Sequence, residues 1–355
     1  MVRAARMVIA APTLVAEEHA MKVDGLLGWQ LAAVGDEAVA LEELGYAGAM
    51  SVETAHDPFF PLLLAAQRTT RIDLMTSIAV AFARTPMIMA NIGHDLNAAS
   101  KGRFILGLGS QIKPHITKRF GMPWSEPAAR MREFVLAMRA IWATWHEGTP
   151  LTFVGKYYAH TLMTPMFTPT NKEFGAPRVF LAAVGPRMTE VAGEVCDGVI
   201  IHAFTTMQYL RDTTLPALER GWARSGRKRA DFEISYPVFV ATGRDAAELS
   251  ASKKAVAKQI AFYGSTPAYR PVLESIGAGE LQDELNRMSK QGRWDEMGTL
   301  IGDDILNAFA VVGEPDTIAA GIKARCGNLV DRVSAAYATI SREDQARMVD
   351  ELRAG

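Results

Sequence analysis

The chain has 355 residues, and 49% of them are hydrophobic, which is enough for a large buried core within one barrel-sized domain. Its 38 basic and 39 acidic residues leave a net charge of −1, which argues against a nucleic-acid or anionic-membrane partner. Two cysteines, Cys196 and Cys326, exclude a disulfide framework, and no CxxC or CxxH spacing offers a metal site. We therefore expect both cysteines to be buried core residues and the protein to be cytoplasmic.

Residues 1–20 are predicted to be a disordered N-terminal extension that precedes the domain. Arg3 and Arg6 stand before an apolar stretch, 7–16, which faintly imitates a signal peptide. Pro12 interrupts that stretch, and acidic residues follow where a small-residue cleavage site should be. Elsewhere no apolar run approaches the roughly 20 residues of a membrane helix.

From Met21 onwards, strand-like runs alternate with helical patterns. In chain order the predicted strands are 22–28, 46–52, 71–80, 103–108, 178–183, 198–203, 232–241 and 331–337. The predicted helices are 36–44, 62–68, one that opens at Thr85-Pro86 with a threonine cap, 127–147, and one that begins at Ser341.

Eight strand–helix alternations without a second compositional zone predict one domain over 21–355. Its fold class is α/β, a single (β/α)₈ TIM barrel. The strands are unevenly spaced, since 110–177 separate the fourth from the fifth and 243–330 separate the seventh from the eighth. The barrel therefore carries insertions after strands 4 and 7. Because active sites of such barrels lie at the C-terminal ends of the strands, the residues after each strand are the functional candidates.

The second strand is followed by Glu53, His56 and Asp57. An imidazole between two carboxylates at this end of a barrel suits proton transfer, so Glu53 and His56 are the predicted catalytic residues. Pro58 follows Asp57, which makes Asp57 a turn or cap residue. The alternative is that Asp57 caps the next helix while His56 merely packs.

The fourth and fifth strands each end in a glycine turn. After the fourth come Gly109, Ser110 and Gln111, where backbone could approach a phosphate closely. This is not a dinucleotide fingerprint, because Ile112 takes the last position and no helix is predicted to open there. The alternative reading is a tight strand exit.

The fifth strand ends in Val184, Gly185 and Pro186, with Pro186 in the first turn of a helix. The free N–H groups of a helix N-terminus, with Arg187 beside them, form an anion site. The alternative is an ordinary turn with a surface arginine. The composition of the end of the third strand indicates only a buried strand and predicts no site there.

Together these segments resemble luciferase-like monooxygenases, and within them the branch that uses coenzyme F420, an 8-hydroxy-5-deazaflavin. The resemblance covers about 21–337. Its marks are 76–78, 102–110, Arg130 with 141–142, 155–158, 182–186, 192–193, 197–198 and 312–315, and a softer match over 259–271.

The resemblance implies an oxidoreductase that moves hydride between F420 and a small organic substrate. It implies a cis peptide at Ser77–Ile78, within the cofactor-binding residues Thr76 to Ala79, as a support beneath the ring. It also implies that the phosphate-bearing tail lies on Gly109 to Gln111 and Val184 to Arg187, and that the protein is a homodimer. The alternatives are an FMN-dependent two-component monooxygenase and a non-catalytic flavin-binding barrel.

Two departures from the sugar-phosphate dehydrogenases of this branch argue against glucose 6-phosphate as substrate. Ile112 stands where those enzymes have a glutamate. Where they have an adjacent Asp-His pair, this chain has Glu53 and His56, which are three positions apart. Of the remaining histidines, His94 is predicted to be packed or solvated within a helix, and His115 and His202 are possible pocket groups. Five aromatic residues could line or fill the pocket: Trp29, Phe59, Phe60, Trp124 and Tyr263.

Overall fold

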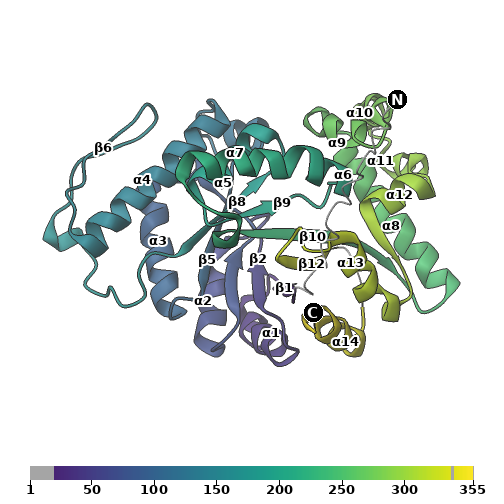
Figure 1. The fold of residues 1–355 in the computed structure, drawn as a ribbon, viewed down its shortest axis with the longest axis horizontal. Coiled ribbons are helices and arrows are strands. Elements are labelled where there is room, and N and C mark those ends of the chain that lie inside the picture. The colour runs from purple at the N-terminus through teal and green to yellow at the C-terminus, as the bar shows by residue number, and fades with distance from the viewer. Residues whose placement is uncertain (1–19, 337–339, 355) are drawn as a thin grey trace, which may run out of the picture.

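The computed structural model describes residues 20–336 and 340–354 (Figure 1). Nearly all of the predicted N-terminal extension, 1–19, lies outside these described residues, as does Tyr337 at the predicted end of the eighth strand. Among the described residues, no helix is both long enough and apolar enough to cross a membrane. Cys196 and Cys326 are free and buried, and burial raises the pKa of each thiol to about 12.

Eight parallel strands close into a barrel, which confirms the predicted fold. Each strand pairs with the next, and pairing of the eighth strand with the first completes the ring. In order around the barrel they are β1 (Lys22–Leu26), β2 (Gly48–Ser51), β3 (Asp73–Thr76), β5 (Phe104–Gly109), β8 (Arg178–Ala183), β9 (Gly198–Ile201), β10 (Glu233–Thr242) and β12 (Arg332–Ala336).

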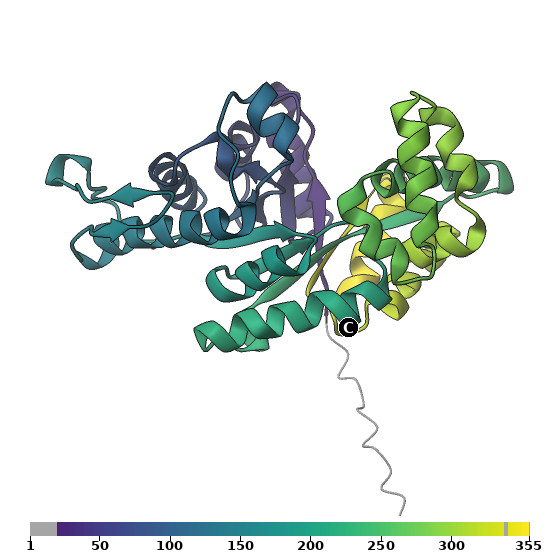
Figure 2. The same cartoon turned by 90° about the horizontal axis from the view of Figure 1, so that it is seen from above.

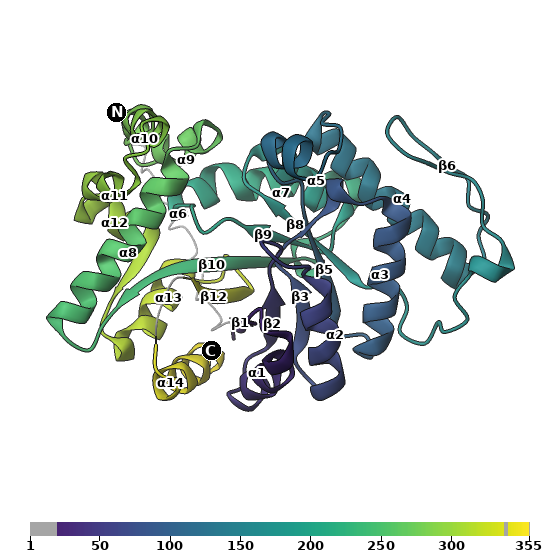
Figure 3. The same ribbon diagram turned by 180° about the vertical axis from the view of Figure 1, so that it is seen from behind.

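Helices cover the outside of the ring, and Figure 3 shows the first of them side by side along the strands. They are α1 (Leu31–Glu43), α2 (Phe59–Arg68), α3 (Pro86–Ala99), α4 (Pro127–Glu147), α5 (Pro186–Val195), α7 (Leu215–Ser225), α13 (Ile318–Cys326) and α14 (Arg342–Arg353). The predicted bounds of α4 and the Thr85 cap of α3 are confirmed, since the Thr85 side chain accepts from the Ile88 N–H. α1 begins at Leu31 rather than Asp36, because the Gln30 carbonyl accepts from the N–H groups of Ala33 and Val34 and starts the helix without a polar cap.

The predicted third strand is interrupted. β3 ends at Thr76, and a two-residue strand, β4 (Ala79–Val80), resumes on the far side of a bulge and pairs with β5. The break comes at the Ser77–Ile78 peptide, which is cis. At the bulge the backbone leaves the plane of the sheet, so residues 77 and 78 do not pair with a neighbouring strand. The prediction of one continuous strand over 71–80 was therefore wrong.

Two insertions extend the barrel on opposite sides, as Figure 2 shows. The first follows β5 and contains η2 (His115–Arg119), α4, and a hairpin of β6 (Phe153–Val154) and β7 (Ala159–His160), with η3 (Pro165–Phe167) after it. The second follows β10 and contains α8 (Ala246–Gly264), η6 (Pro267–Tyr269), α9 (Arg270–Glu274), α10 (Gly279–Lys290), α11 (Trp294–Met297), η7 (Gly298–Leu300), α12 (Asp303–Phe309) and β11 (Ala310–Gly313).

The second insertion is joined to the barrel by the length of β10. The first residues of β10 pair with β9, the middle residues pair with β12, and the last four pair with β11. Strand β11 was not predicted from the sequence. Phe239 and Ala241 of β10 thereby enter a second apolar cluster with Ile260 and Leu273 of the insertion.

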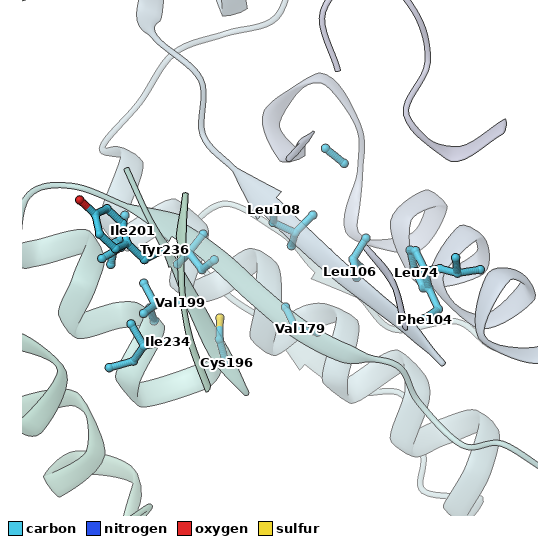
Figure 4. Packing of buried hydrophobic residues seen from close by; sticks show 14 of the residues in the cluster. Leu74, Phe104, Leu106, Leu108, Val179, Cys196, Val199, Ile201, Ile234 and Tyr236 are labelled. Carbon is cyan, nitrogen blue, oxygen red and sulfur yellow. The ribbon is translucent and has the colours of Figure 1, made fainter. Parts of the chain in front are cut away.

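The main core lies between the outer face of the barrel and its helices. Figure 4 shows part of it, including Leu106, Leu108, Val179 and Ile234. Residues of the opposite parity face the barrel interior, because side chains alternate along a strand. They form a small separate cluster of Met50, Met75, Ile105, Phe180 and Ile200.

At the N-terminal ends of the strands, the interior is filled by ion pairs. Arg332 is fully buried and binds Asp24 through two hydrogen bonds of 2.6 and 2.9 Å. It also reaches Asp73 at 2.8 Å and Glu233 at 3.1 Å. Gly48 lies beside this network, where a Cβ would stand only 2.1 Å from an Asp24 oxygen, so only glycine fits there.

Candidate functional site

The floor of the barrel's C-terminal mouth is apolar. Ile78 and Ala182 pack on the interior cluster of Met75, Phe180 and Ile200. Leu26, two residues beyond Asp24 on the same face of β1, is 59% exposed. Leu26 therefore adds an exposed apolar side chain at the end of an inward-facing strand position.

The bulge at the end of β3 is fitted against β5. The Ser77 N–H donates to the Ser51 carbonyl at 2.7 Å, and the buried Thr76 hydroxyl donates to the Gly107 carbonyl at 2.7 Å. A Cβ on Gly107 would come within 1.8 Å of the Thr76 oxygen, and one on Gly109 within 2.6 Å of the Ile78 side chain. The two glycines of β5 are therefore required to admit the bulge, and the bulge places Ile78 on the floor.

Glu53 lies at the exit of β2, where its carboxylate is already engaged. It accepts from the Val80 N–H at 2.7 Å and from Arg84 at 2.8 and 3.0 Å, and its side chain is only 7% exposed. Glu53 is therefore held by Arg84 and the Val80 N–H, and no hydrogen bond joins it to His56 among the described residues. Arg84 was not predicted as a site residue, and the one sign of it in the sequence is a basic residue shortly after the third predicted strand.

His56 is exposed at the same exit, and its ring centroid lies 6.3 Å from that of Trp29. Asp57 accepts from the Phe59 N–H at 2.9 Å and binds Arg84 at 3.1 Å. Asp57 is thus a cap and ion-pair residue, as its position before Pro58 indicated. Of the two predicted catalytic side chains, that of His56 has no hydrogen-bond or ion-pair partner among the described residues and is free to meet a substrate.

The β5 exit turns sharply at Gln111, whose φ of 57° is left-handed. The Ser110 hydroxyl donates to the Gln111 carbonyl, and the Gln111 side-chain oxygen accepts from the Ile112 N–H at 2.9 Å. After this turn the chain enters η2, and Arg119 of η2 donates to the Thr54 carbonyl in the β2 exit. The β2 and β5 exits are therefore in direct contact.

The β8 exit leads into α5 through Val184 and Gly185. The N-cap Gly185 makes no side-chain cap bond, and a Cβ there would meet no heavy atom within 4 Å. Arg187 in the first turn is exposed and forms no ion pair with any described residue. An uncapped helix N-terminus beside an unpaired arginine gives this exit a positive electrostatic potential.

The β9 exit carries His202, which is followed by buried Phe204, Thr205 and Thr206. The Phe204 N–H donates to His202 Nδ1 at 3.0 Å. The Tyr263 and Tyr269 rings lie 4.5 and 5.1 Å from the imidazole, and burial lowers its pKa to about 4.

Two surface hollows lie away from this mouth. One, of about 510 Å³, is at the opposite end of the barrel and is lined by Lys22, Tyr46 and Asp73 among others. The other, of about 550 Å³, lies beside Thr242 and Asp344. Neither includes a predicted site residue, and among the described residues no cluster of three metal-ligating side chains occurs.

Comparison with known proteins matches this arrangement to one family. The family model described as luciferase-like monooxygenase matches residues 7–332. An uncharacterised protein of Mycobacterium tuberculosis is 58% identical over 323 residues, which cover 91% of this chain and 95% of that protein. A second M. tuberculosis protein, described as a coenzyme F420-dependent oxidoreductase, is 28% identical and covers 79% of this chain and 83% of its own length.

Solved structures share the fold. The coenzyme F420-dependent tetrahydromethanopterin reductase of Methanopyrus kandleri superposes with a TM-score of 0.76 at 21% identity, over 94% of this chain and 97% of the reductase. An EDTA monooxygenase of Chelativorans superposes with a TM-score of 0.69 at 15% identity, over 94% and 93%. The family model spans nearly the whole barrel, and this chain belongs to the luciferase-like monooxygenase family.

Proposed function

We propose that this protein is an F420-dependent oxidoreductase that transfers hydride between the deazaflavin and a small organic substrate. One combination of features carries the proposal. An apolar floor at the mouth, made by Ile78 and Ala182, lies on the same barrel end as the uncapped N-terminus of α5 with its free Arg187. A flat ring with an anionic tail needs both kinds of surface.

The residues present fit such a cofactor. The open space above Gly185 leaves the first N–H groups of α5 accessible to a phosphate, and Arg187 adds a cation without a competing carboxylate among the described residues. Gly109, Ser110 and Gln111 would hold the tail on its other side, and Thr76 to Ala79 would support the ring. Bound deazaflavin would supply or accept the hydride.

His56 is the proposed acid–base residue. It is exposed at the β2 exit and has no hydrogen-bond partner among the described residues, so its ring nitrogens are available to a substrate oxygen. Glu53 acts through position rather than proton transfer, because Arg84 and the Val80 N–H fix its carboxylate. In that role Glu53 joins the β2 exit to β4, next to the bulge.

An equilibrium titration tests the cofactor assignment. The purified chain is expected to bind F420 more tightly than FMN at matched ionic strength. Arg187→Ala should weaken F420 binding about 10-fold, the loss expected for one charge-assisted hydrogen bond of about 1.5 kcal/mol. Lys254→Ala is the control, because Lys254 is an exposed cation of α8 without an ion pair among the described residues. A clear preference for FMN would contradict the cofactor assignment and leave the fold intact.

The second candidate is an FMN-dependent two-component monooxygenase, favoured by the likeness of the fold to the EDTA monooxygenase. The same titration separates the two candidates. A chain that binds either cofactor but catalyses no hydride transfer would instead be a flavin-binding barrel without activity.

A further inference from the structure

His202 occupies an inward-facing position at the rim of the mouth. It stands two residues after Ile200, which belongs to the interior cluster, and side chains two apart in an extended segment share a face. The segment behind it is rigid, because Phe204, Thr205 and Thr206 are buried and the Thr206 hydroxyl lies 2.8 Å from that of Ser275. The imidazole is therefore held between the β9 exit and the aromatic rings of Tyr263 and Tyr269.

The hydrogen bond from the Phe204 N–H decides which ring nitrogen carries the proton. Nδ1 accepts that bond, so in the neutral imidazole the proton resides on Nε2. The described residues provide no acceptor for Nε2, and the side chain keeps part of its surface exposed. His202 thus presents one N–H donor to whatever enters the mouth.

The surroundings of this donor are aromatic and uncharged. Tyr263 lies edge-on to the imidazole with centroids 4.5 Å apart, and Tyr269 lies tilted at 5.1 Å and stacks on Phe204 at 5.7 Å. Burial is the cause of the lowered pKa of His202, and no neighbouring charge contributes. The imidazole therefore stays neutral at ordinary pH and offers no counter-charge to a carboxylate or phosphate.

We propose that His202 binds the substrate by donating from Nε2 to an uncharged oxygen, and that the substrate class is an apolar ketone or enone. This inference rests on the proposed function. In carbonyl reduction, a bound reduced deazaflavin would supply the hydride that forms the new C–H bond, and the C=O electron pair would move to oxygen. The oxygen then takes a proton from His56, and the product is the alcohol. The Nε2–H bond strengthens as charge develops on that oxygen, which is how such donors accelerate reactions.

In a conjugated enone, the hydride would add to the β-carbon instead of the carbonyl carbon. The supplied hydride would form the C–H bond there, and the π electrons would shift to give an enolate with its charge on the carbonyl oxygen. A proton from His56 would give the enol, and tautomerisation, which places a proton on the α-carbon, would give the saturated ketone. In both cases the oxygen that gains charge is the one that His202 binds. The aromatic rings beside it and the exposed Leu26 favour an apolar body for the substrate.

Two substitutions of His202 distinguish a residue that binds the substrate from one that only holds the backbone of the β9 exit. In His202→Asn the amide oxygen replaces Nδ1 and can accept from the Phe204 N–H two residues on, but no donor reaches the place of Nε2. In His202→Gln the amide nitrogen replaces Nε2, but the local acceptor is lost. A substrate donor predicts that Gln retains function and Asn does not. A purely structural histidine predicts the reverse.

The assay is reduction of cyclohexanone and cyclohex-2-enone by reduced F420, together with F420 titration of every variant. We expect His202→Asn to lower kcat/KM about 100-fold or more, and His202→Gln to stay within about 10-fold of the native chain, with unchanged F420 affinity in both. Retained activity in His202→Asn overturns the inference. A native chain that binds F420 but reduces neither probe overturns the substrate class and leaves the cofactor assignment.

A measurement independent of turnover completes the test. With ¹⁵N-labelled histidine, the His202 resonances are expected to report a proton on Nε2 and to shift at Nε2 when cyclohex-2-enone is added. If both variants lose activity, or if the native chain fails to bind F420, this titration decides the inference. A proton on Nδ1, or no shift at Nε2 with a saturating probe, overturns it.

Discussion

Replacement of Arg332 by methionine should severely destabilise the barrel. Arg332 is fully buried, and Asp24, whose side chain is 1% exposed, has both its oxygens bound to that arginine. Burial by itself lowers the pKa of Arg332, but the carboxylates of Asp24, Asp73 and Glu233 outweigh it and raise that pKa above its ordinary value. The guanidinium is therefore the charge on which the whole network depends.

The magnitude follows from what the substitution leaves behind. Lys22, Arg178 and Arg332 face three carboxylates, and without Arg332 those three carboxylates face two cations. Asp73 and Glu233 keep Arg178 as a partner, but Asp24 keeps no ion-pair partner among the described residues. Loss of one partner of a buried pair costs about 3–5 kcal/mol, and Coulomb attraction at 4 Å in an effective dielectric of 20 gives about 4 kcal/mol.

Urea unfolding followed by circular dichroism and by tryptophan fluorescence measures this free energy, and coincident curves justify a two-state analysis. Lys22→Met is the matched control, because the Lys22 side chain is 45% exposed and its bond to Glu233 should contribute about 0–1 kcal/mol. The double variant Arg332→Met with Asp24→Asn should be less destabilised than Arg332→Met alone. An Arg332→Met variant no less stable than Lys22→Met would refute the reasoning.

Three further predictions concern the mouth and the helices around it. His56→Ala should lower turnover about 10²–10⁴-fold and leave F420 affinity nearly unchanged, and unchanged turnover would remove His56 from the reaction. Gly107→Ala should lower the thermal midpoint, because its Cβ would stand 1.8 Å from the Thr76 carbonyl oxygen, whereas Gly302→Ala should not, since nothing lies within 4 Å of its Cβ. Burial, with a smaller contribution from His94, lowers the pKa of His146, so the unfolded chain binds the proton more readily and stability falls as pH drops through about 6.5. Thermal melts at pH 7.5 and 5.5 should therefore show a larger loss for the native chain than for His146→Gln, and equal losses would contradict this.

Much of the barrel could be predicted because its signals are local. The alternation of buried runs with capped helices depends on neighbouring residues, and it placed α4 and β8 at their observed bounds. The pattern around Thr85 and Pro86 likewise fixed the start of α3, since a cap is made within one turn. The cis peptide at Ser77–Ile78 was predicted from family resemblance and is confirmed. The composition of this segment by itself indicated only a buried strand.

The tertiary structure decided what depends on contacts between distant residues. No local pattern could show that Arg84 would take the Glu53 carboxylate, or that Arg332 would meet Asp24 across 308 positions of the chain. β11 was missed because its four residues become a strand only where the end of β10 leaves the barrel and pairs with them. The eight barrel strands and their order could be predicted from the sequence, because periodicity and capping act within a few residues. Which polar groups remain free at the mouth was decided only when the strands closed, because each is free or engaged according to partners that folding brings from elsewhere.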